Sequence, residues 1–325
     1  MPDAVSRSAR LAAGAFFIVL LALLGGCASM TPQTFALRED WPADVPHTAE
    51  LASVPFFTQD EYQCGPAALA TLLVHAGANV TPESLVSQVY LPARQGSLQV
   101  EMLAAPRRHG LVSYRLEARY EDLLREVAAG NPVIVLQDTG GGFITNWHYA
   151  VVVGFDYAKG DVILRSGETR RDVTSFTMLE YTWKRSNYWA MVVMPPGRLP
   201  ATATEAGYLP AIAAMERVGA PGAVEAAYGA FLDRWPDSVG AGIGLANRYY
   251  ARGDLANAEG VLRRAAARNP DSVVVLNNLA QTLSEQGRNA EALEVIDRAA
   301  QPGSLFAPDV RDTRTLILQR LGKPG

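Results

Sequence analysis

The C-terminal third of this chain repeats itself every 34 residues, a pattern that few folds can accommodate. Gly219, Gly253 and Gly287 follow one another at this interval. The same interval separates Pro236 from Pro270, Leu245 from Leu279, Ala246 from Ala280 and Ala258 from Ala292. In a pair of helices, glycine ends the first helix, small alanines let the helices approach closely, and proline stops the second. The period therefore predicts a stack of helical hairpins, each burying its apolar face against the next.

A period of this length, with glycine, alanine and proline at these places, resembles the tetratricopeptide repeat. The resemblance covers roughly residues 208–322 and predicts an all-α domain over residues 208–325. A Pro-Pro-Gly sequence and a run of alanine and threonine mark the linker before it, at residues 195–207. The resemblance implies a concave surface, so we expect the repeats to bind a protein partner or a peptide.

The N-terminus has the parts of an export signal. Arg7 and Arg10 supply positive charge, and residues 11–24 form an apolar run. A helix that spans a bilayer needs about 20 apolar residues, so this shorter run fits the apolar core of a signal peptide better. We therefore predict a signal peptide over residues 1–26.

The sequence Leu-Gly-Gly-Cys that ends at Cys27 resembles the lipobox of bacterial lipoproteins. The resemblance implies that the signal is cut before Cys27 and that lipid on this residue holds the protein in the membrane. Alanine and serine follow the cysteine, with no aspartate. By family resemblance this implies the bacterial cell envelope, in the outer membrane and facing the periplasm. Residues 27–50 are polar and contain prolines, as expected of a tether.

Residues 51–194 predict a mixed domain in which helices come first and strands follow. Helices are expected at 65–77, from 81 onward, at 98–105 and at 120–129, and strands at 132–136, 149–155, 162–164 and 189–194. The helix at 81 has threonine as its N-cap and proline in its first turn. A turn around Lys159 and Gly160 joins two of the strands as a hairpin. This order indicates an α+β fold with N-terminal helices packed on an antiparallel sheet.

With Cys27 carrying lipid, Cys64 is left as a free thiol. It stands at the start of a predicted helix, directly before Gly65 and Pro66. Unpaired backbone N–H groups and the positive end of the helix dipole gather at this place, and both favour a thiolate. We therefore expect the pKa of Cys64 to lie below the roughly 8.5 of an ordinary thiol. Gly65 would let a substrate carbonyl approach closely.

A thiolate nucleophile needs a base close by, and the chain offers four histidines. His47 lies in the tether, His75 lies further along the helix of the cysteine, and His109 lies at a helix end. His148 begins a predicted strand after a glycine-rich loop, where it can meet a helix N-terminus. We therefore predict that His148 is the base. No two histidines have the spacing of metal ligands, so we expect neither a metal nor a cofactor.

The segments around Cys64 and His148 resemble those of the bacteriocin-processing, double-glycine leader peptidases. The first reads Gln-x-x-x-Gln-Cys-Gly-Pro-Ala-Ala-Leu, and His-Tyr-Ala-Val-Val-Val-Gly-Phe-Asp follows 84 residues after the cysteine. These enzymes are papain-like cysteine peptidases, and the resemblance spans about residues 51–194. It implies that Cys64 is the nucleophile and that His148 is the general base and then the general acid. A glutamine side chain and the Cys64 backbone N–H would stabilise the oxyanion.

The oxyanion glutamine departs from the family's pattern. In the family it lies six residues before the cysteine, where this chain has Thr58. Gln59 is five residues before the cysteine, and we prefer it because Gln63 adjoins the nucleophile and would point elsewhere. Gln63 remains the alternative.

The acidic residue that orients the family's histidine is also missing from its expected place. The matching segment of the return strand carries Ser166 instead of an aspartate. Counting along the hairpin sets His148 opposite residues 168–170, which include Glu168. The third member is therefore Ser166 or Glu168, or there is none. Loss of an orienting group can lower the rate by orders of magnitude, so weak activity is one expected outcome.

These features together indicate a lipid-anchored envelope cysteine peptidase that cleaves a peptide or protein substrate and uses its repeats for recruitment. The net charge of −4 argues against a nucleic-acid partner. The leader peptides of the classical family members are presented inside the cell, so we do not carry that substrate over. One alternative is a weak or inactive peptidase fold that binds peptides or protein partners. Another is amide or thioester chemistry with the same residue pair.

Overall fold

The computed structural model of the chain describes residues 30–58, 63–141, 144–300 and 306–322. The predicted signal peptide, Cys27 and Gln59 lie outside these residues. The chain divides into two compact units, one of residues 1–103 and 115–192 and the other of residues 104–114 and 193–325. None of the helices in the described ranges combines the length and the apolar character needed to cross a bilayer.

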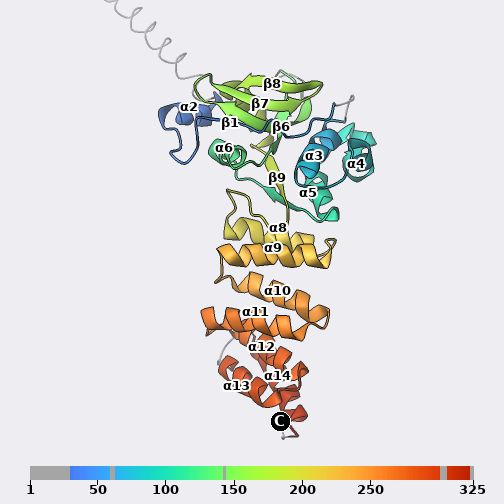
Figure 1. Ribbon diagram of the computed structural model, residues 1–325, viewed down its shortest axis with the longest axis vertical. Helices are drawn as coiled ribbons and strands as arrows, with labels where there is room; N and C mark the ends of the chain where they lie inside the picture. The colour runs from blue at the N-terminus through green and yellow to red at the C-terminus, as the bar shows by residue number, and fades with distance from the viewer. Residues whose placement is uncertain (1–29, 59–62, 142–143, 301–305, 323–325) are drawn as a thin grey trace, which may run out of the picture. The chain divides into compact units, whose positions relative to one another are not determined.

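The first unit is built on an antiparallel sheet, as the sequence predicts. Its strands follow the order β9-β5-β6-β7-β8, and β1 also pairs with β6 (Figure 1). The bounds are β1 Thr48–Glu50, β5 Val133–Asp138, β6 Trp147–Asp156, β7 Asp161–Ser166, β8 Thr169–Ser175 and β9 Ala190–Met194. Strand β4, Val112–Arg115, and a small hairpin of β2, Tyr90–Leu91, and β3, Gly96–Ser97, complete the strands of the described ranges. Both β5 and the middle of β6 are buried throughout, which explains their continuous runs of valine.

Four helices of this part of the chain lie close to their predicted positions. Their bounds are α3 Cys64–His75, α4 Pro82–Val89, α5 Gln99–Arg108 and α6 Tyr120–Ala128. Thr81 caps α4 as predicted, because its hydroxyl accepts a hydrogen bond from the Ser84 backbone N–H. Residues 65–73 of α3 are all buried, so this helix is packed on every side and holds its first residue, Cys64, in a fixed place.

Several helices and strands are not predicted from the sequence. The expected tether over residues 27–50 in fact contains α2, Pro32–Glu39, and β1, both packed into the first unit. Strand β8 and the helix α7, Phe176–Trp183, follow the last predicted strand of the hairpin. Strand β8 alternates half-buried and exposed residues and is rich in arginine and threonine, so its pattern gives little apolar signal. Helix α2 is short and carries few apolar side chains, and its docking depends on residues far away in sequence.

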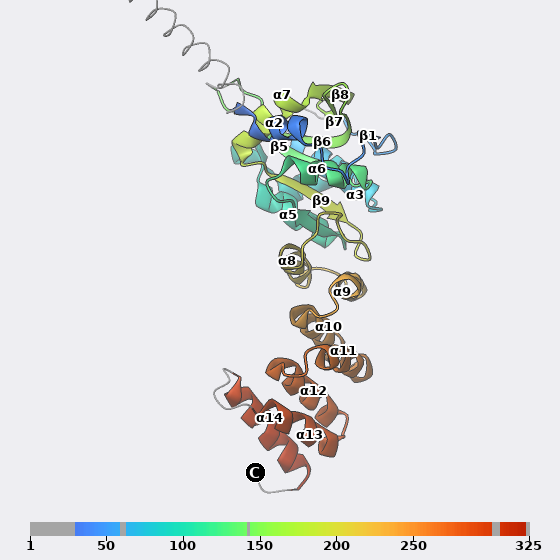
Figure 2. The ribbon, with the colours of Figure 1, turned by 90° about the vertical axis from the view of Figure 1, so that its left-hand side faces the viewer.

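The second unit contains a run of helices that follow one another as a stack (Figures 1 and 2). They are α8 Glu205–Met215, α9 Pro221–Arg234, α10 Val239–Ala251, α11 Leu255–Arg268, α12 Val273–Glu285, α13 Asn289–Ala299 and α14 Ala307–Arg320. Helix α8 starts inside the predicted linker, with Thr204 as its N-cap.

The repeated residues of the second unit have the packing roles that the period predicts. Gly253 and Gly287 follow α10 and α12 with φ of +80° and +81°, the left-handed conformation that ends a helix and favours glycine. Ala258 and Ala292 are completely buried where consecutive helices meet. The prediction of an α+β domain followed by helical repeats is therefore confirmed.

Candidate active site

Cys64 is the first residue of α3, and its immediate neighbours fit no bulkier side chain. A Cβ atom added to Gly65 would lie 2.2 Å from Ser97 Oγ, so glycine is required by the close approach of the 94–99 loop. Pro66 is buried in the first turn of the helix, where its missing N–H costs nothing. The thiol itself is free and only half-buried, which leaves it accessible from one side.

His148 lies near the start of β6, where the strand emerges from the core. It pairs with Gln137 of β5, and the two residues after it are buried. Its imidazole Nε2 lies 2.9 Å from the hydroxyl oxygen of Ser166, the last residue of β7. This contact fixes the ring plane and leaves Nδ1 as the nitrogen available to a reacting group.

Cys64 and His148 line the same cleft. This cleft of about 1030 Å³ is also lined by the 94–99 loop, the start of β6 and residues 185–187. The backbone N–H of Tyr149, the residue directly after His148, faces the thiol. The hydroxyl of Tyr149 donates to the Ser97 backbone oxygen at 3.1 Å and so joins β6 to the same loop. Two residues separated by 84 positions in sequence thus share one wall of an open cleft.

The protonation of the pair differs from the sequence expectation. Burial raises the pKa of the Cys64 thiol, and the N–H groups of Tyr149, Gly65 and Cys64 itself oppose this rise without reversing it. The expected lowering at a helix N-terminus is therefore wrong, because desolvation outweighs the backbone N–H groups. Burial also lowers the pKa of His148, against an opposing attraction from Asp172. At neutral pH the resting pair is thus a thiol and a neutral imidazole.

Of the two candidates for the third member, Ser166 contacts His148. In the pairing of β6 with β7, Asp156 lies opposite Asp161 and Val151 lies opposite Arg165. If this pairing continued, residue 168 would lie opposite His148. Strand β7 instead ends at Ser166, which pairs with Thr169 across a tight turn. The turn takes Glu168 out of the ladder, and its side chain is exposed. Counting along the hairpin fails because it cannot tell where the strand stops.

Asp172 is a residue that the sequence reasoning missed. It lies on β8 and pairs with Leu164, two residues along β7 from Ser166. Its carboxylate raises the pKa of His148, so it favours a positively charged imidazole. Because β8 lacks a clear apolar alternation, no sequence signal placed this carboxylate near the histidine.

Of the two glutamines considered as oxyanion donors, the structure describes Gln63. Gln59 lies outside the described residues, so its position is not part of the structure. Gln63 stands directly before α3 as its N-cap residue, and its side chain makes no capping hydrogen bond to the helix. The backbone N–H groups of Cys64 and Gly65 face the thiol.

The buried carboxylate of Asp138 fixes the loop between β5 and β6 at the edge of the cleft. Asp138 Oδ1 accepts hydrogen bonds from the backbone N–H groups of Gly140, at 3.0 Å, and Asn146, at 2.9 Å. Its other oxygen lies 2.8 Å from Nε of Arg185, which lines the cleft. Burial raises the pKa of Asp138, but the two N–H groups and Arg185 outweigh it and bring the pKa below its ordinary value. Asp138 therefore stays ionised and ties the loop after β5 to the cleft.

The remaining histidines lie away from this cleft. His75 Nε2 lies 3.1 Å from the Gly130 backbone oxygen, and His47 packs against the rings of Trp41 and Tyr157. His109 belongs to the second unit. Within the described ranges, no cluster of three or more His, Cys, Asp or Glu side chains could hold a metal ion.

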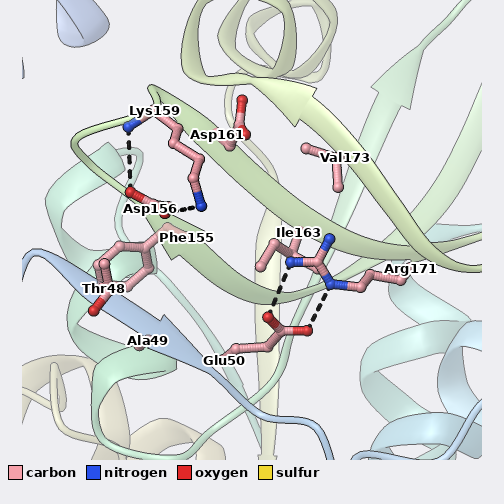
Figure 3. Close-up of a pocket in the computed structure, with 10 residues that line it drawn as sticks. All are labelled: Thr48, Ala49, Glu50, Phe155, Asp156, Lys159, Asp161, Ile163, Arg171 and Val173. Atoms are coloured by element: carbon pink, nitrogen blue, oxygen red, sulfur yellow. Dashed lines mark hydrogen bonds and ion pairs between the residues drawn. The ribbon is translucent and has the colours of Figure 1, made fainter.

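A second, smaller cavity of about 300 Å³ lies at the other end of β6 (Figure 3). Four of its five charged side chains form two ion pairs: both oxygens of Glu50 bind Arg171, at 2.9 and 3.1 Å, and Asp156 binds Lys159 at 2.8 Å. Neither cysteine nor histidine is among its ten lining residues. This cavity therefore offers neither a thiol nor an imidazole.

Comparison with known proteins identifies both parts of the chain. Residues 51–191 match the Peptidase C39 like family, and residues 243–304 match the tetratricopeptide repeat. No curated protein matches the chain. The first part is thus a C39-peptidase-like, papain-like domain, and the second contains tetratricopeptide repeats.

Two bacterial proteins are among the solved structures that match the chain. A putative C39-like peptidase from Bacillus anthracis is 18% identical, with a TM-score of 0.38, and the match covers 46% of this chain and 98% of that one. The peptidase domain of Streptococcus ComA, a bifunctional ABC transporter involved in quorum sensing, is also 18% identical. Its TM-score is 0.35, and the match covers 43% of this chain and 96% of that domain.

Proposed function

We propose that this protein is a cysteine peptidase of the bacterial cell envelope, in which Cys64 and His148 cleave peptide bonds. The observation that carries the proposal is their presence in one open cleft, with the imidazole held by Ser166, in a C39-peptidase-like domain. A fold alone does not define chemistry, but a thiol and an oriented imidazole in one cleft support nucleophilic catalysis.

The reaction begins from the neutral pair. As the Cys64 sulfur attacks the carbonyl carbon of the scissile bond, His148 takes the thiol proton and becomes an imidazolium. The carbonyl oxygen becomes an oxyanion, which accepts hydrogen bonds from the Cys64 backbone N–H and from Gln59 or Gln63. Each well-placed donor contributes roughly 3–4 kcal/mol to stabilising this species.

The second half of the reaction returns the proton. The imidazolium of His148 protonates the leaving amine as the C–N bond breaks, which leaves a thioester on Cys64. A water molecule, deprotonated by His148, then attacks the thioester and releases the carboxylic acid and the free thiol. Asp172 favours the imidazolium in both steps because its charge is negative.

The test is to incubate the purified full-length protein with envelope proteins and to identify new N-termini by mass spectrometry. The wild-type protein is expected to produce new termini, and the Cys64→Ser and His148→Ala variants are expected to produce none. His75→Ala is the matched control, because its ring contacts Gly130 rather than the cleft, and it should cleave normally. Equal products from all four proteins would contradict the proposal.

A second candidate function is a peptide-binding scaffold without catalysis. It is favoured by a serine in place of the orienting carboxylate and by the raised pKa of Cys64. In that case Cys64→Ala leaves the cellular phenotype unchanged, and peptides bind the wild-type protein without being cut. Amide or thioester chemistry other than proteolysis would instead give products without new N-termini.

The membrane anchor and the recruiting role of the repeats belong to the same proposal. Cys27 is proposed to carry the lipid that holds the protein in the outer membrane, facing the periplasm. The helical repeats are proposed to bind a protein partner, as tetratricopeptide repeats suggest. Mass spectrometry of the mature N-terminus tests the lipid anchor: the wild-type protein should carry lipid on Cys27, and the Cys27→Ser variant should carry none.

A further inference from the structure

Helix α2 is fastened to the first unit although it follows the proposed anchor almost directly. The carboxylate of Glu180, which is completely buried, accepts hydrogen bonds from the backbone N–H groups of Gln33, at 2.9 Å, and Thr34, at 2.6 Å. A carboxylate at the N-terminus of a helix satisfies free N–H groups and matches the helix dipole. The Gln33 side chain also donates to the Ala118 backbone oxygen at 3.0 Å. Helix α2 therefore moves with the domain rather than as part of a flexible tether.

The outer side of α2 and α7 presents large apolar side chains to solvent. Met30 is 46% exposed, Phe35 is 49% exposed and Met178 is 53% exposed. Helix α2 lies along α7 (Figure 2), and Arg38 donates a hydrogen bond to Thr177, the neighbour of Met178. Phe35 precedes Arg38 by three residues and so shares its side of the helix. We call Met30, Phe35 and Met178 the α2–α7 face.

The length of chain before α2 sets the distance of this face from the anchor. Only two residues separate Cys27 from Met30. Three Cα–Cα steps span at most about 11 Å, even in a fully extended chain. A lipid on Cys27 would therefore hold Met30 at the level of the lipid headgroups, and the docked helix would bring the rest of the face with it.

We propose that the α2–α7 face rests on the membrane surface and holds the first unit in one orientation on the bilayer, an inference that depends on the proposed lipidation of Cys27. Apolar side chains on a membrane-anchored protein gain by entering the boundary between headgroups and acyl chains. The charges around the face are balanced, because Arg38 and Lys184 are offset by Glu39 and Asp40 at the end of α2. The face should therefore orient the unit through apolar contact, with little dependence on anionic lipid.

The test places a photo-cross-linking amino acid, benzoylphenylalanine, at position 35 or 178 of the full-length protein in bacterial membranes. Position 100 is the control, because Val100 is 63% exposed and lies on α5 rather than on α2 or α7. The expected result is cross-linking to lipid at positions 35 and 178 with a yield several times that at position 100. Replacing exposed side chains should leave the fold intact, which circular dichroism can check.

The mass of the mature N-terminus, measured on the same samples, separates the two proposals. Lipid on Cys27 with equal yields at all three positions would overturn the membrane-facing orientation and leave the anchor standing. An N-terminus without lipid would overturn the anchor and the orientation together. Lipid on Cys27 with selective cross-linking at positions 35 and 178 would support both.

Discussion

His148 Nε2 lies 2.9 Å from the hydroxyl oxygen of Ser166, at the place where related peptidases are expected to use a carboxylate. A hydroxyl can hold an imidazole in one plane and select its tautomer, but it carries no charge to stabilise an imidazolium. A negative charge that acts on His148 comes from Asp172 on β8. In the proposed mechanism, the Ser166 hydroxyl orients the imidazole and the Asp172 carboxylate stabilises its charge, two tasks that a single aspartate usually performs.

Ser166→Ala should weaken catalysis moderately. We expect kcat/KM to fall about three- to tenfold, because a neutral hydrogen bond contributes roughly 0.5–1.5 kcal/mol. Ser166→Asp should instead raise the pKa of His148 and increase kcat/KM, since a carboxylate stabilises the imidazolium formed during attack. Rates of peptide cleavage for the two variants check this. A decrease with Ser166→Asp as large as with Ser166→Ala would show that the hydroxyl itself is required.

The pH dependence should reflect a neutral resting pair. Because the pKa of His148 is lowered by burial, protonation should abolish activity only below the usual imidazole range, which centres near pH 6.5. Because the pKa of Cys64 is raised by burial, its alkylation by iodoacetamide should still be rising at a pH of about 8.5, where half of ordinary thiols are ionised. Measuring both profiles on the full-length protein checks the two directions. A rate of alkylation that is already constant at neutral pH would show a thiolate and contradict this description.

Asp172→Asn should move the acidic side of the pH profile without removing activity. Loss of the carboxylate lowers the pKa of His148 further. The variant should therefore remain active down to a lower pH than the wild-type protein. At pH 8, where the imidazole is neutral in both proteins, the rates should differ much less. Glu168→Gln is the matched control, because this side chain is exposed in the turn after β7. A shift with Glu168→Gln and none with Asp172→Asn would reverse the assignment of the acid.

Gly65→Ala should damage both the fold and the site. The added methyl group would lie 2.2 Å from Ser97 Oγ and 2.6 Å from Ser97 Cβ, so the segment of β3 that carries Ser97 must move. We expect a loss of about 1–3 kcal/mol in the free energy of unfolding, measured by denaturant titration, together with loss of cleavage. Gly229→Ala is the control, since no atom lies within 4 Å of its added Cβ and the position is inside α9. That variant should be as stable as the wild-type protein or slightly more so.

Features that depend on residues close together in sequence, or on a repeated period, could be predicted from the sequence alone. Thr81 and Ser84 cap their helix through contacts three residues apart, and Gly253 and Gly287 end theirs by a backbone conformation that glycine favours. The start of α3 at Cys64 also follows from its own segment, since Gly65 and Pro66 suit a first turn and apolar residues follow. These interactions are local, so the order of residues is enough to specify them.

Only the tertiary structure decided which residue contacts His148 and how Cys64 is protonated. The choice of Ser166 over Glu168 depends on where β7 stops pairing, and that depends on the whole sheet. The pKa of Cys64 depends on how much water the packed helix and the neighbouring loop exclude, which a helix N-terminus by itself does not reveal. Likewise, Glu180 fastens α2 to the domain across more than a hundred residues of chain. Packing between segments decides where a strand ends, how deeply a residue is buried and which distant carboxylate contacts it. The residue pattern within one segment cannot predict these features.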